Sequence, residues 1–508
     1  MYDTLQEGFI FPELDHENVN NRDNFGIAFS GGGTRATAMA LGQLRALNRS
    51  GILNKARYIS AVSGGSWATM PFTFLDQGLD DETFLGPYLN PDQITTGDLD
   101  YAPDFSLTRA IDHATFIDKI LPELDFGHDL FAQIVCKIIL FPFKIGDQTR
   151  FFSYNQKSLG DILALNPNLT PDNFYLVNPS PNRPFYIAGG TLLRPDFHRY
   201  QFEMTPLYVG VNTFFLKAGA NKRYNIGGGY VQPHGFNTYA PKSISEDIAN
   251  VKVGKVMNFF NLGDMVGTSS AAPAEYAERF KLSWMGFPEF KYWCPGKNAT
   301  SKKAKKYDFG DGGILENLAI MPLLKRKVDK IILFVNCETK LTGPDETKNE
   351  ITDSIPALFY PLKHQNGSGE FDLNVVFANQ KDKYLELVND LLSKINQGQP
   401  PVHINTYKVT KQPHYNITEE YEVEIMWVYN APVKEWENSL KPEITDLLKK
   451  SKLLENFPYF KTFMENPPEI LALKPLQVNL LSHLTAWIVN SGKDLIEDFL
   501  NNRKKVIV

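Results

Sequence analysis

A serine surrounded by small residues is the first feature of the chain that could do chemistry. Ser63 lies within Ser60–Ser66 (SAVSGGS), between an apolar run expected to be a strand and a segment expected to be a helix. A sharp strand-to-helix turn exposes a serine Oγ as a nucleophile, and only small neighbours fit around such a turn. The usual signature is Gly-x-Ser-x-Gly, and here Ala61 takes the place of the first glycine. The motif therefore indicates either a catalytic serine or an ordinary Gly/Ser turn.

A glycine-rich segment, Ser30–Ala36 (SGGGTRA), has three interpretations. A dinucleotide site needs an acidic residue about 20 positions further on, but no Asp or Glu occurs between Asn24 and Leu75. A Walker A loop needs Gly-Lys-Ser/Thr, which is missing. The third interpretation is an oxyanion hole, in which backbone N–H groups at the start of a helix bind a developing negative oxygen.

The region around this segment carries only positive charge. It contains five basic side chains and no acidic one: Arg35, Arg45, Arg49, Lys55 and Arg57. Such a region suits a substrate that carries phosphate. We expect Arg35 to be the functional residue because it lies on the glycine loop itself. Arg45 and Arg49 are expected on a solvated helix face.

An aspartate between glycines is the candidate base. Asp311 lies in Gly310–Gly313 (GDGG), after a short expected strand at Tyr307–Phe309. Such an aspartate occupies a tight turn that other backbone or a ligand can approach closely, although a plain Asp-Gly turn would have the same sequence. Asp308 would point to the other face of the strand. A Ser-His-Asp triad would need a later histidine, and four occur without a recognisable motif: His364, His403, His414 and His483.

The composition is that of a large globular protein. The chain has 508 residues, 43% hydrophobic and 22% charged, which excludes disorder, collagen and coiled coil. A net charge of −6 argues against a nucleic-acid binder. Three scattered cysteines form no CxxC pair and no zinc-type spacing, so we expect no metal site and a reducing compartment. The N-terminal residues lack the pattern of a secretory signal, which favours a cytoplasmic location.

Alternating strand and helix patterns predict the elements that must position these residues. Phe25–Phe29 and Arg57–Val62 are expected strands, and Thr34–Asn48 between them is an expected helix. Further strands are expected at 185–188, 330–335 and 423–428, and further helices at 391–399 and 440–454. The alternation favours an α/β fold with a mostly parallel central sheet between helix layers. We expect one catalytic domain over residues 1–508, in which residues 76–181 form a cap and residues 341–508 complete the sheet and cover it with helices.

Two segments have both a structural and a membrane-related interpretation. Leu130–Phe143 (LFAQIVCKIILFPF) is too short to span a membrane, and fits either a buried core helix or an interfacial lid. Lys302–Lys306 (KKAKK) is either a solvated loop or a patch that binds lipid headgroups.

Taken together, the motifs resemble those of a known enzyme family. Ser30–Arg35 (SGGGTR), the short stretch 50–53 (SGIL) and Tyr58–Trp67 (YISAVSGGSW) resemble the catalytic core of cytosolic phospholipase A2 and its phospholipase B relatives. Gly310–Gly313 resembles the Asp-Gly-Gly/Ala motif of patatin-like acyl hydrolases. Thr268–Pro273 (TSSAAP) is similar to a patatin segment, and 202–210 (FEMTPLYVG) to a cytosolic phospholipase segment.

This resemblance implies a Ser-Asp dyad that cleaves fatty-acyl esters of phospholipids or lysophospholipids. Ser63 would attack the ester carbonyl, and Asp311 would accept its proton without a histidine. The amides of Gly32 and Gly33 would hold the oxyanion, and Arg35 would bind the lipid phosphate. A carboxylate is a weak base for an alcohol, so the oxyanion hole must supply much of the stabilisation. No cofactor is implied.

The implied partner is a phospholipid membrane or micelle, without nucleic acid or nucleotide; a protein activator is not readable from the sequence. About 24 residues precede the first core strand, so we expect no calcium-dependent C2 domain before it. Transient docking would then fall to the segment 130–143, including Phe141 and Phe143, and to the lysine run. Alternatives are an acyltransferase or neutral-lipid hydrolase with the same dyad, and a non-catalytic lipid-binding module on the same fold.

Overall fold

The computed structural model describes most of the chain. The described residues are 1–113, 130–179, 183–193, 199–219, 222–239, 241, 243–245, 248–251, 260–271, 288–295, 303–345, 351–362, 373–461 and 473–501. Thus Pro273, Lys302 and His364 lie outside the described residues.

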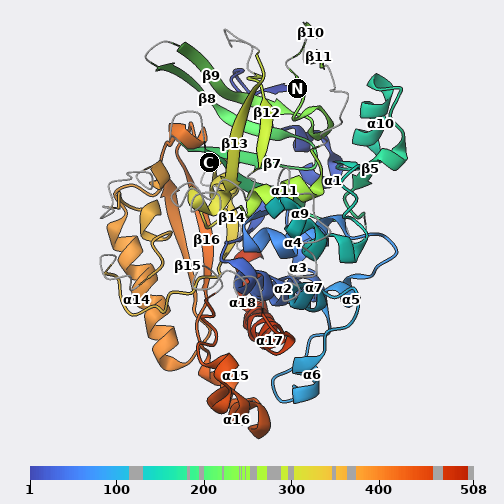
Figure 1. The fold of residues 1–508 in the computed structure, drawn as a ribbon. Coiled ribbons are helices and arrows are strands. Elements are labelled where there is room, and N and C mark those ends of the chain that lie inside the picture. Colours follow the sequence, from blue (N-terminus) through green and yellow to red (C-terminus); the bar gives the residue numbers. More distant parts are fainter. Residues whose placement is uncertain are drawn as a thin grey trace.

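Five parallel strands form the centre of one large sheet (Figure 1). In spatial order they are β6 (Phe185–Leu192), β3 (Tyr58–Val62), β2 (Phe25–Phe29), β14 (Lys330–Val335) and β16 (Tyr421–Tyr429). Every residue of β2 and β3 is buried, as expected for parallel strands covered on both faces. The observed bounds of β2 and β14 coincide with the expected ones, and the predicted α/β class is confirmed.

Antiparallel strands extend this parallel centre on both sides. β15 (Val402–Val409) pairs with β16 at one edge. Beyond β6 follow β7 (Tyr200–Met204), β8 (Val209–Gly219), β9 (Lys222–Val231) and the short β1 (Tyr2–Asp3). The sheet is therefore mixed. The glycine loop and Ser63 follow the parallel strands β2 and β3, whereas Asp311 ends the antiparallel strand β13 (Lys305–Asp311).

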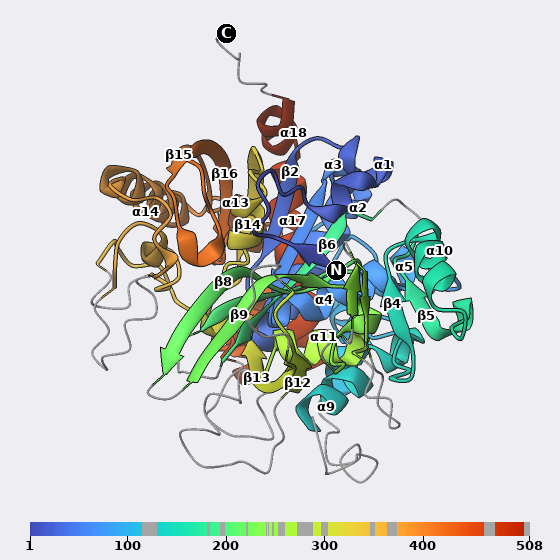
Figure 2. The same ribbon diagram turned by 90° about the horizontal axis from the view of Figure 1, so that it is seen from above.

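Helices lie on both sides of the parallel strands (Figures 1 and 2). α14 (Lys381–Gln397) lies on one side of β15 and β16, and α2 (Gly33–Arg49), α4 (Gly64–Phe74) and α17 (Pro475–Ser491) lie on the other. α2 and α17 pack closely: a Cβ at Gly42 would lie 2.0 Å from the carbonyl oxygen of Ser482. No helix in the described part of the chain is long and apolar enough to cross a membrane.

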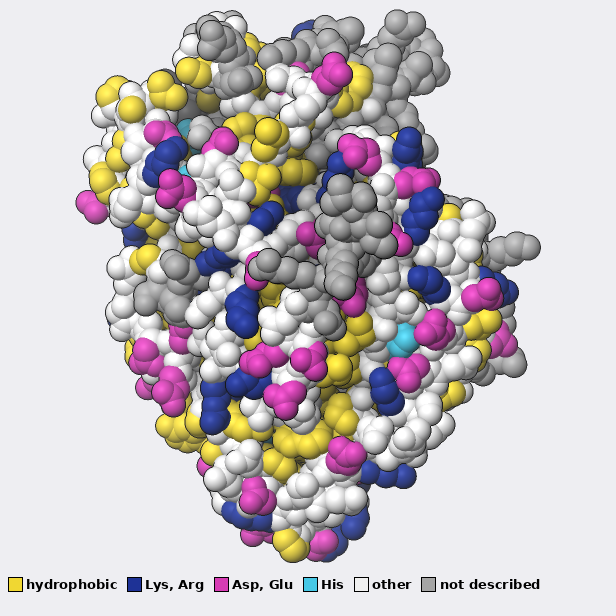
Figure 3. Space-filling view, turned by 180° about the vertical axis from the view of Figure 1, so that it is seen from behind, with side chains coloured by type: hydrophobic (Ala, Val, Ile, Leu, Met, Phe, Trp, Pro, Cys, Tyr) yellow, Lys and Arg dark blue, Asp and Glu magenta, His cyan; other side chains and the backbone are white. Residues whose placement is uncertain are grey.

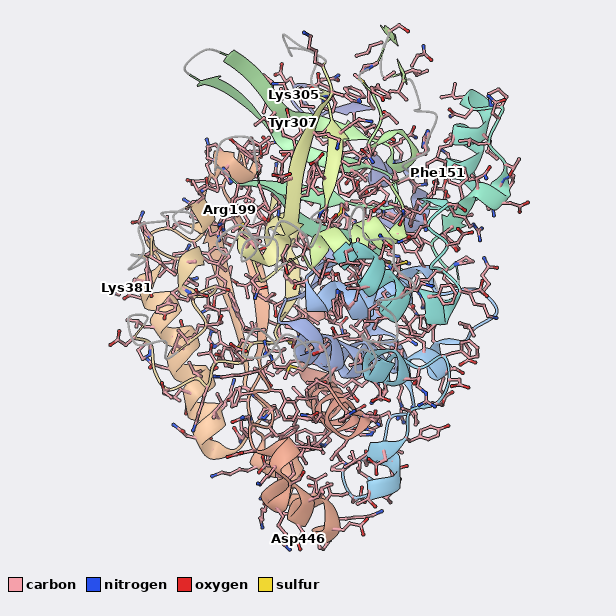
Figure 4. All side chains as sticks on the ribbon, viewed as in Figure 1. Phe151, Arg199, Lys305, Tyr307, Lys381 and Asp446 are labelled. Atoms are coloured by element: carbon pink, nitrogen blue, oxygen red, sulfur yellow. The ribbon has the colours of Figure 1, made fainter. Side chains whose placement is uncertain are left out.

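The remaining elements are mostly short. They are α1 (Glu17–Asn20), α3 (Ile52–Lys55), α5 (Asp81–Leu85), α6 (Thr96–Asp100), α7 (Leu107–His113), α9 (Leu130–Ile139), β4 (Phe151–Ser153), α10 (Gln156–Leu165), β5 (Phe174–Leu176), β10 (Ser243–Ser245), β11 (Ile248–Asn250), α11 (Leu262–Ser269), β12 (Glu289–Tyr292), β13 (Lys305–Asp311), α13 (Met321–Lys325), α15 (Lys434–Asn438), α16 (Pro442–Lys450) and α18 (Lys493–Asn501). Phe151, labelled in Figure 4, marks the small parallel pair β4–β5, which lies apart from the large sheet.

The structure distinguishes between the interpretations of the two segments that could contact a membrane. α9 is buried along most of its length, which confirms the core-helix interpretation for 130–139. Phe143 is also fully buried, so its expected role in docking is wrong, whereas Phe141 is 61% exposed. Lys305 and Lys306 begin strand β13 rather than lying in a loop (Figure 4), and Lys306 pairs with Glu289.

The expectation that Arg45 lies on a solvated helix face is also wrong. Its side chain is buried, and its guanidinium donates to the carbonyl oxygen of Leu85 and to the hydroxyl of Ser482. It therefore joins α2 to α17 and to the end of α5. Arg49, four residues later, is exposed as expected and lies over the ring of Tyr88.

A buried cluster of charges joins the N-terminal segment to the antiparallel side of the sheet. Arg326 donates to both carboxylate oxygens of Glu203 and to Glu13 at 2.8 Å. Lys325 lies 2.9 Å from Glu203, and Tyr230 donates to the same carboxylate at 2.6 Å. Burial alone would raise the pKa of Glu203, but Arg326 and Lys325 outweigh it and lower the pKa to about 2.

This cluster predicts a specific, pH-dependent contribution to stability. Glu203→Gln should lower the free energy of unfolding at neutral pH by about 3–5 kcal/mol, because buried Lys325 loses its carboxylate and buried Arg326 keeps only that of Glu13. Since folding lowers the pKa of Glu203 from 4.5 to about 2, the ionised group stabilises the fold above pH 4.5, and this is lost as the pH falls toward 2. Urea unfolding of wild type and variant should therefore converge across that interval.

The matched control is an exposed ion pair in α10. Asp161 lies 3.4 Å from Lys157, and both side chains are well exposed. Asp161→Asn should change the free energy of unfolding by less than about 1 kcal/mol at any pH. Equal effects of the two substitutions would show that the buried cluster adds nothing to the fold.

Candidate active site

Two strands meet end to end on one edge of β6. β3 runs parallel to β6 and its pairing stops at Val62 opposite Gly189. β13 approaches antiparallel from the other end, and its pairing stops at Asp311 opposite Gly190. The residue that follows β3 is Ser63, so this arrangement places Ser63 next to Asp311 although 248 positions separate them.

The serine has the geometry expected of a sharp strand-to-helix turn. Ser63 has a φ of 51° and a ψ of −128°, a conformation that costs a non-glycine residue energy. Its Oγ donates to Asp311 Oδ2 at 2.7 Å. The two side chains are 9% and 3% exposed respectively, so the pair is largely shielded from water.

The glycines after the serine are required by close backbone contacts. A Cβ at Gly64 would lie 2.0 Å from the carbonyl oxygen of Gly33, and one at Gly65 would lie 2.6 Å from that of Phe29. Ala61 is different, because it is an ordinary buried residue of β3 and is not among the residues with positive φ. The departure from the usual signature is therefore accommodated by the strand.

The glycine loop brings a second helix start to the same point. Gly33 is the first residue of α2 and Gly64 is the first residue of α4, and the Gly33 nitrogen lies 2.8 Å from where a Gly64 Cβ would be. The first N–H groups of a helix have no partner within the helix, and they lie at its positive end. The two converging helix starts can therefore stabilise negative charge beside Ser63. Gly32, with a φ of 136°, forms the turn that leads into α2.

The turn after β13 holds the Asp311 carboxylate. Gly313 N–H donates to Asp311 Oδ1 at 2.7 Å, which leaves Oδ2 for Ser63. Thr191 donates to the Asp311 carbonyl oxygen at 2.8 Å. A Cβ at Gly312 would lie 2.6 Å from the carbonyl oxygen of Gly189, so glycine is needed where this turn crosses β6.

Arg35 lies beside the loop but is already bonded. Its guanidinium donates to the carbonyl oxygens of Asn336 and Phe460, and at 3.0 Å to the Glu338 carboxylate. The remaining terminal nitrogen, Nη2, faces the loop, 2.4 Å from where a Gly32 Cβ would be. Burial lowers the pKa of Arg35, and Glu338 partly offsets this effect.

A polar side chain that the sequence analysis missed lies between the two motifs. Asn317 Oδ1 is 2.2 Å from where a Gly31 Cβ would be, and Ser63 Cβ is 2.9 Å from the same point. Within the described part of the chain, no residue hydrogen-bonds with this amide group. Its backbone carbonyl accepts from Gly31 N–H at 3.0 Å, which joins the turn to the glycine loop.

Glu316 fixes the turn that carries Asn317. Its buried carboxylate accepts from the N–H groups of Leu318, Ile320 and Met321 at the start of α13. Burial raises the pKa of Glu316 to about 7, although these hydrogen bonds lower it. The sequence signal that could have found Asn317 is its position shortly after the Asp-Gly-Gly turn.

Ser269, at the end of α11, holds the backbone of Ser63 by a hydrogen bond. Its carbonyl oxygen accepts from Ser63 N–H at 3.0 Å, and its hydroxyl donates to the Gly189 carbonyl oxygen at 2.7 Å. The segment similar to a patatin motif thus contacts both the turn and β6.

The later histidines that the structure describes have other neighbours. His403 Nδ1 lies 2.8 Å from Asp390, and His414 stacks on Tyr200. Burial, together with Arg45, lowers the pKa of His483 to about 3. Among the described residues, no group of three or more His, Cys, Asp or Glu side chains could hold a metal ion.

Comparison with known proteins places the resemblance on the same residues. Residues 25–74, which include the glycine loop and Ser63, match the lysophospholipase catalytic domain family. The chain is 23% identical over 370 residues to lysophospholipase 1 of Candida albicans, covering 66% of this chain and 57% of that protein. These matches confirm the resemblance to the lysophospholipase (phospholipase B) relatives.

The human GIVD cytosolic phospholipase A2 is one of the solved structures to which this chain is similar. It aligns with 98% of this chain and 61% of its own, at 13% identity and a TM-score of 0.43. The same enzyme in complex with methyl gamma-linolenyl fluorophosphonate and terbium chloride aligns at 15% identity with a TM-score of 0.40. The chain spans about three fifths of the length of these relatives.

The close contact between the two helix starts yields a prediction. Gly64→Ala should force α4 away from α2 and slow labelling of Ser63 by a fluorophosphonate probe about 10²-fold, because the two positive helix starts would no longer lie together beside Ser63. Mass spectrometry of the labelled peptide measures the rate, and circular dichroism checks folding.

Gly160→Ala is the matched control, because a Cβ there would have no atom within 4 Å. It should label at the wild-type rate. A Gly64→Ala protein that labels equally fast would mean that the helix contact does not tune the serine.

Proposed function

We propose that the protein hydrolyses fatty-acyl esters of phospholipids or lysophospholipids through an acyl-Ser63 intermediate. The observation that carries the proposal is the hydrogen bond of 2.7 Å from Ser63 Oγ to Asp311 Oδ2, beside two helix starts. The family match over residues 25–74 supports the lipid ester as substrate class. The proposed setting is cytoplasmic, with transient contact to a membrane.

In the first half of the reaction, Ser63 Oγ attacks the acyl carbonyl carbon while its proton moves to Asp311 Oδ2. The carbonyl oxygen becomes negative and accepts from the amides of Gly32 and Gly33, at the positive end of α2. The C–O bond to the lipid alcohol then breaks, and the alcohol leaves with the proton from Asp311. The fatty acid remains esterified to Ser63.

In the second half, water attacks the acyl-serine and gives a proton to Asp311. The oxyanion forms in the same place, so the same amides stabilise it. Collapse returns the proton to Ser63 Oγ and releases the fatty acid. Asp311 acts as base and acid in turn, and the Gly313 N–H keeps its carboxylate oriented throughout.

Arg35 would bind the phosphate of the lipid through Nη2, which faces the glycine loop. Its other hydrogen bonds, to Asn336, Phe460 and Glu338, hold the guanidinium in that orientation. The Asn317 side chain, whose Oδ1 faces the loop in the structure, would turn its amide N–H toward the ester that lies between the loop and Asp311.

The dyad is tested by fatty-acid release from phospholipid vesicles. Ser63→Ala and Asp311→Asn should each reduce release by several orders of magnitude, since one lacks the nucleophile and the other the base. His403→Gln serves as control and should retain activity, because His403 pairs with Asp390. Full activity of Asp311→Asn would place the base elsewhere, and an inert wild type toward every lipid ester would refute the proposed function.

The role of Asn317 is tested by two substitutions with opposite chemistry. Asn317→Ala should lower kcat on a monomeric ester about 10²-fold with little change in KM, because the donor acts on the transition state. Asn317→Asp keeps the shape but offers only acceptors, so it should be at least as impaired. An active Asp variant would mean that the side chain merely fills space.

A further inference from the structure

A hollow beside the cap helix α9 is lined by a combination of aromatic and cationic side chains. It has a volume of about 590 Å³ and includes Lys137, Phe141, Lys144 and Tyr175 in its lining. None of these residues belongs to the site around Ser63. Phe141 is 61% exposed, although a large apolar side chain gains free energy from burial.

A cationic side chain lies close to each of three aromatic rings at this hollow. Lys137 Nζ lies 4.8 Å from the centre of the Phe141 ring, and the Arg150 guanidinium lies 4.0 Å from that of Tyr175. Lys144 Nζ lies 5.7 Å from the ring of Phe105, which is 41% exposed at the rim. We name these six residues the aromatic-cation rim.

The rim carries a local positive charge on a negatively charged protein. Among the described residues that line the hollow, Lys137 and Lys144 carry positive charge and Asp147 carries negative charge. This carboxylate already accepts from the N–H and hydroxyl of Thr149, which lower its pKa. On the face that Figure 3 shows, acidic and basic side chains are interspersed.

Backbone strain coincides with the rim. Phe105 and Lys144 both have a φ of 62°, which is uncommon for residues other than glycine, Asn and Asp. Side chains held on such positions are kept there by the surrounding structure, and such strain is concentrated at functional sites.

The rim is linked to the serine through one helix pair. On α9, Ala132 Cβ lies 2.5 Å from where a Cβ of Gly267 would be, and Cys136 Sγ lies 3.1 Å from the equivalent point at Gly263. Cys136 also lines the hollow. α11 carries both glycines and ends at Ser269, which accepts from Ser63 N–H.

We infer that the aromatic-cation rim is the surface by which the protein docks on an anionic phospholipid bilayer. Aromatic rings with adjacent cations suit the headgroup level, where the ring enters the apolar boundary and the cation meets lipid phosphate or carboxylate. Each lysine near an anionic surface contributes about a factor of five to binding. This inference rests on the proposed function, because the bilayer would supply the substrate.

The test compares vesicle binding with hydrolysis of a monomeric ester. Vesicles of phosphatidylcholine, with and without phosphatidylserine, are sedimented with the full chain and its variants. Phe105→Ser combined with Phe141→Ser should lower binding to both kinds at least about tenfold. Lys137→Gln combined with Lys144→Gln should lower binding only to the anionic vesicles, about thirtyfold. Hydrolysis of a soluble short-chain ester should stay unchanged in both.

Leu165→Ser is the matched control, because Leu165 on α10 is 60% exposed but lies outside the hollow. It should bind vesicles like the wild type. Wild-type vesicle binding by the rim variants, or an equal loss in Leu165→Ser, would overturn the inference. An inert wild type that still needs the rim for binding would refute only the proposed function.

Discussion

One edge of β6 serves two different strands, and the candidate site depends on this arrangement. β3 uses the first part of the edge and β13 uses the last part, so the two strand ends face each other at Gly189 and Gly190. On β6, the Gly189 carbonyl oxygen accepts a hydrogen bond from the Ser269 hydroxyl, and the Thr191 hydroxyl donates to the Asp311 carbonyl oxygen. Neither Ser63 nor Asp311 would have its neighbour if either strand extended by a residue or two along that edge.

The consequence of this meeting point is crowding of backbone on backbone. Glycine is required at 64, 65 and 312 because a Cβ at each would lie under 3 Å from a backbone atom of the site. That crowding brings the starts of α2 and α4 together and so concentrates two positive helix ends on one serine. In the proposed mechanism a carboxylate is the sole partner of the serine, so other groups must stabilise the negative charge of the reaction, and the two helix ends are the groups placed to do so.

The sequence was sufficient for the local parts of this structure and insufficient for the long-range ones. Apolar runs of five or six residues predicted β2 and β14 with their bounds, and Gly/Ser spacing singled out Ser63 and Asp311. The 2.7 Å contact between them follows from a pairing across 248 positions that no local pattern encodes. The expectation for Arg45 was wrong because α17, a helix that the sequence analysis did not predict, covers that face of α2. Asn317 was missed because its importance comes from its neighbours and not from a motif.

The order of the segments along the chain also determines how long Ser63 exists before Asp311 is synthesised. Ser63 is made 248 residues before Asp311, and β14, which lies between β2 and β16, follows later still. At a synthesis rate of about 5–20 residues per second, the serine turn exists for roughly 12–50 s before its carboxylate emerges from the ribosome. During translation the nascent chain therefore contains Ser63 without Asp311, and the hydrogen-bonded pair forms only when β13 has paired with β6.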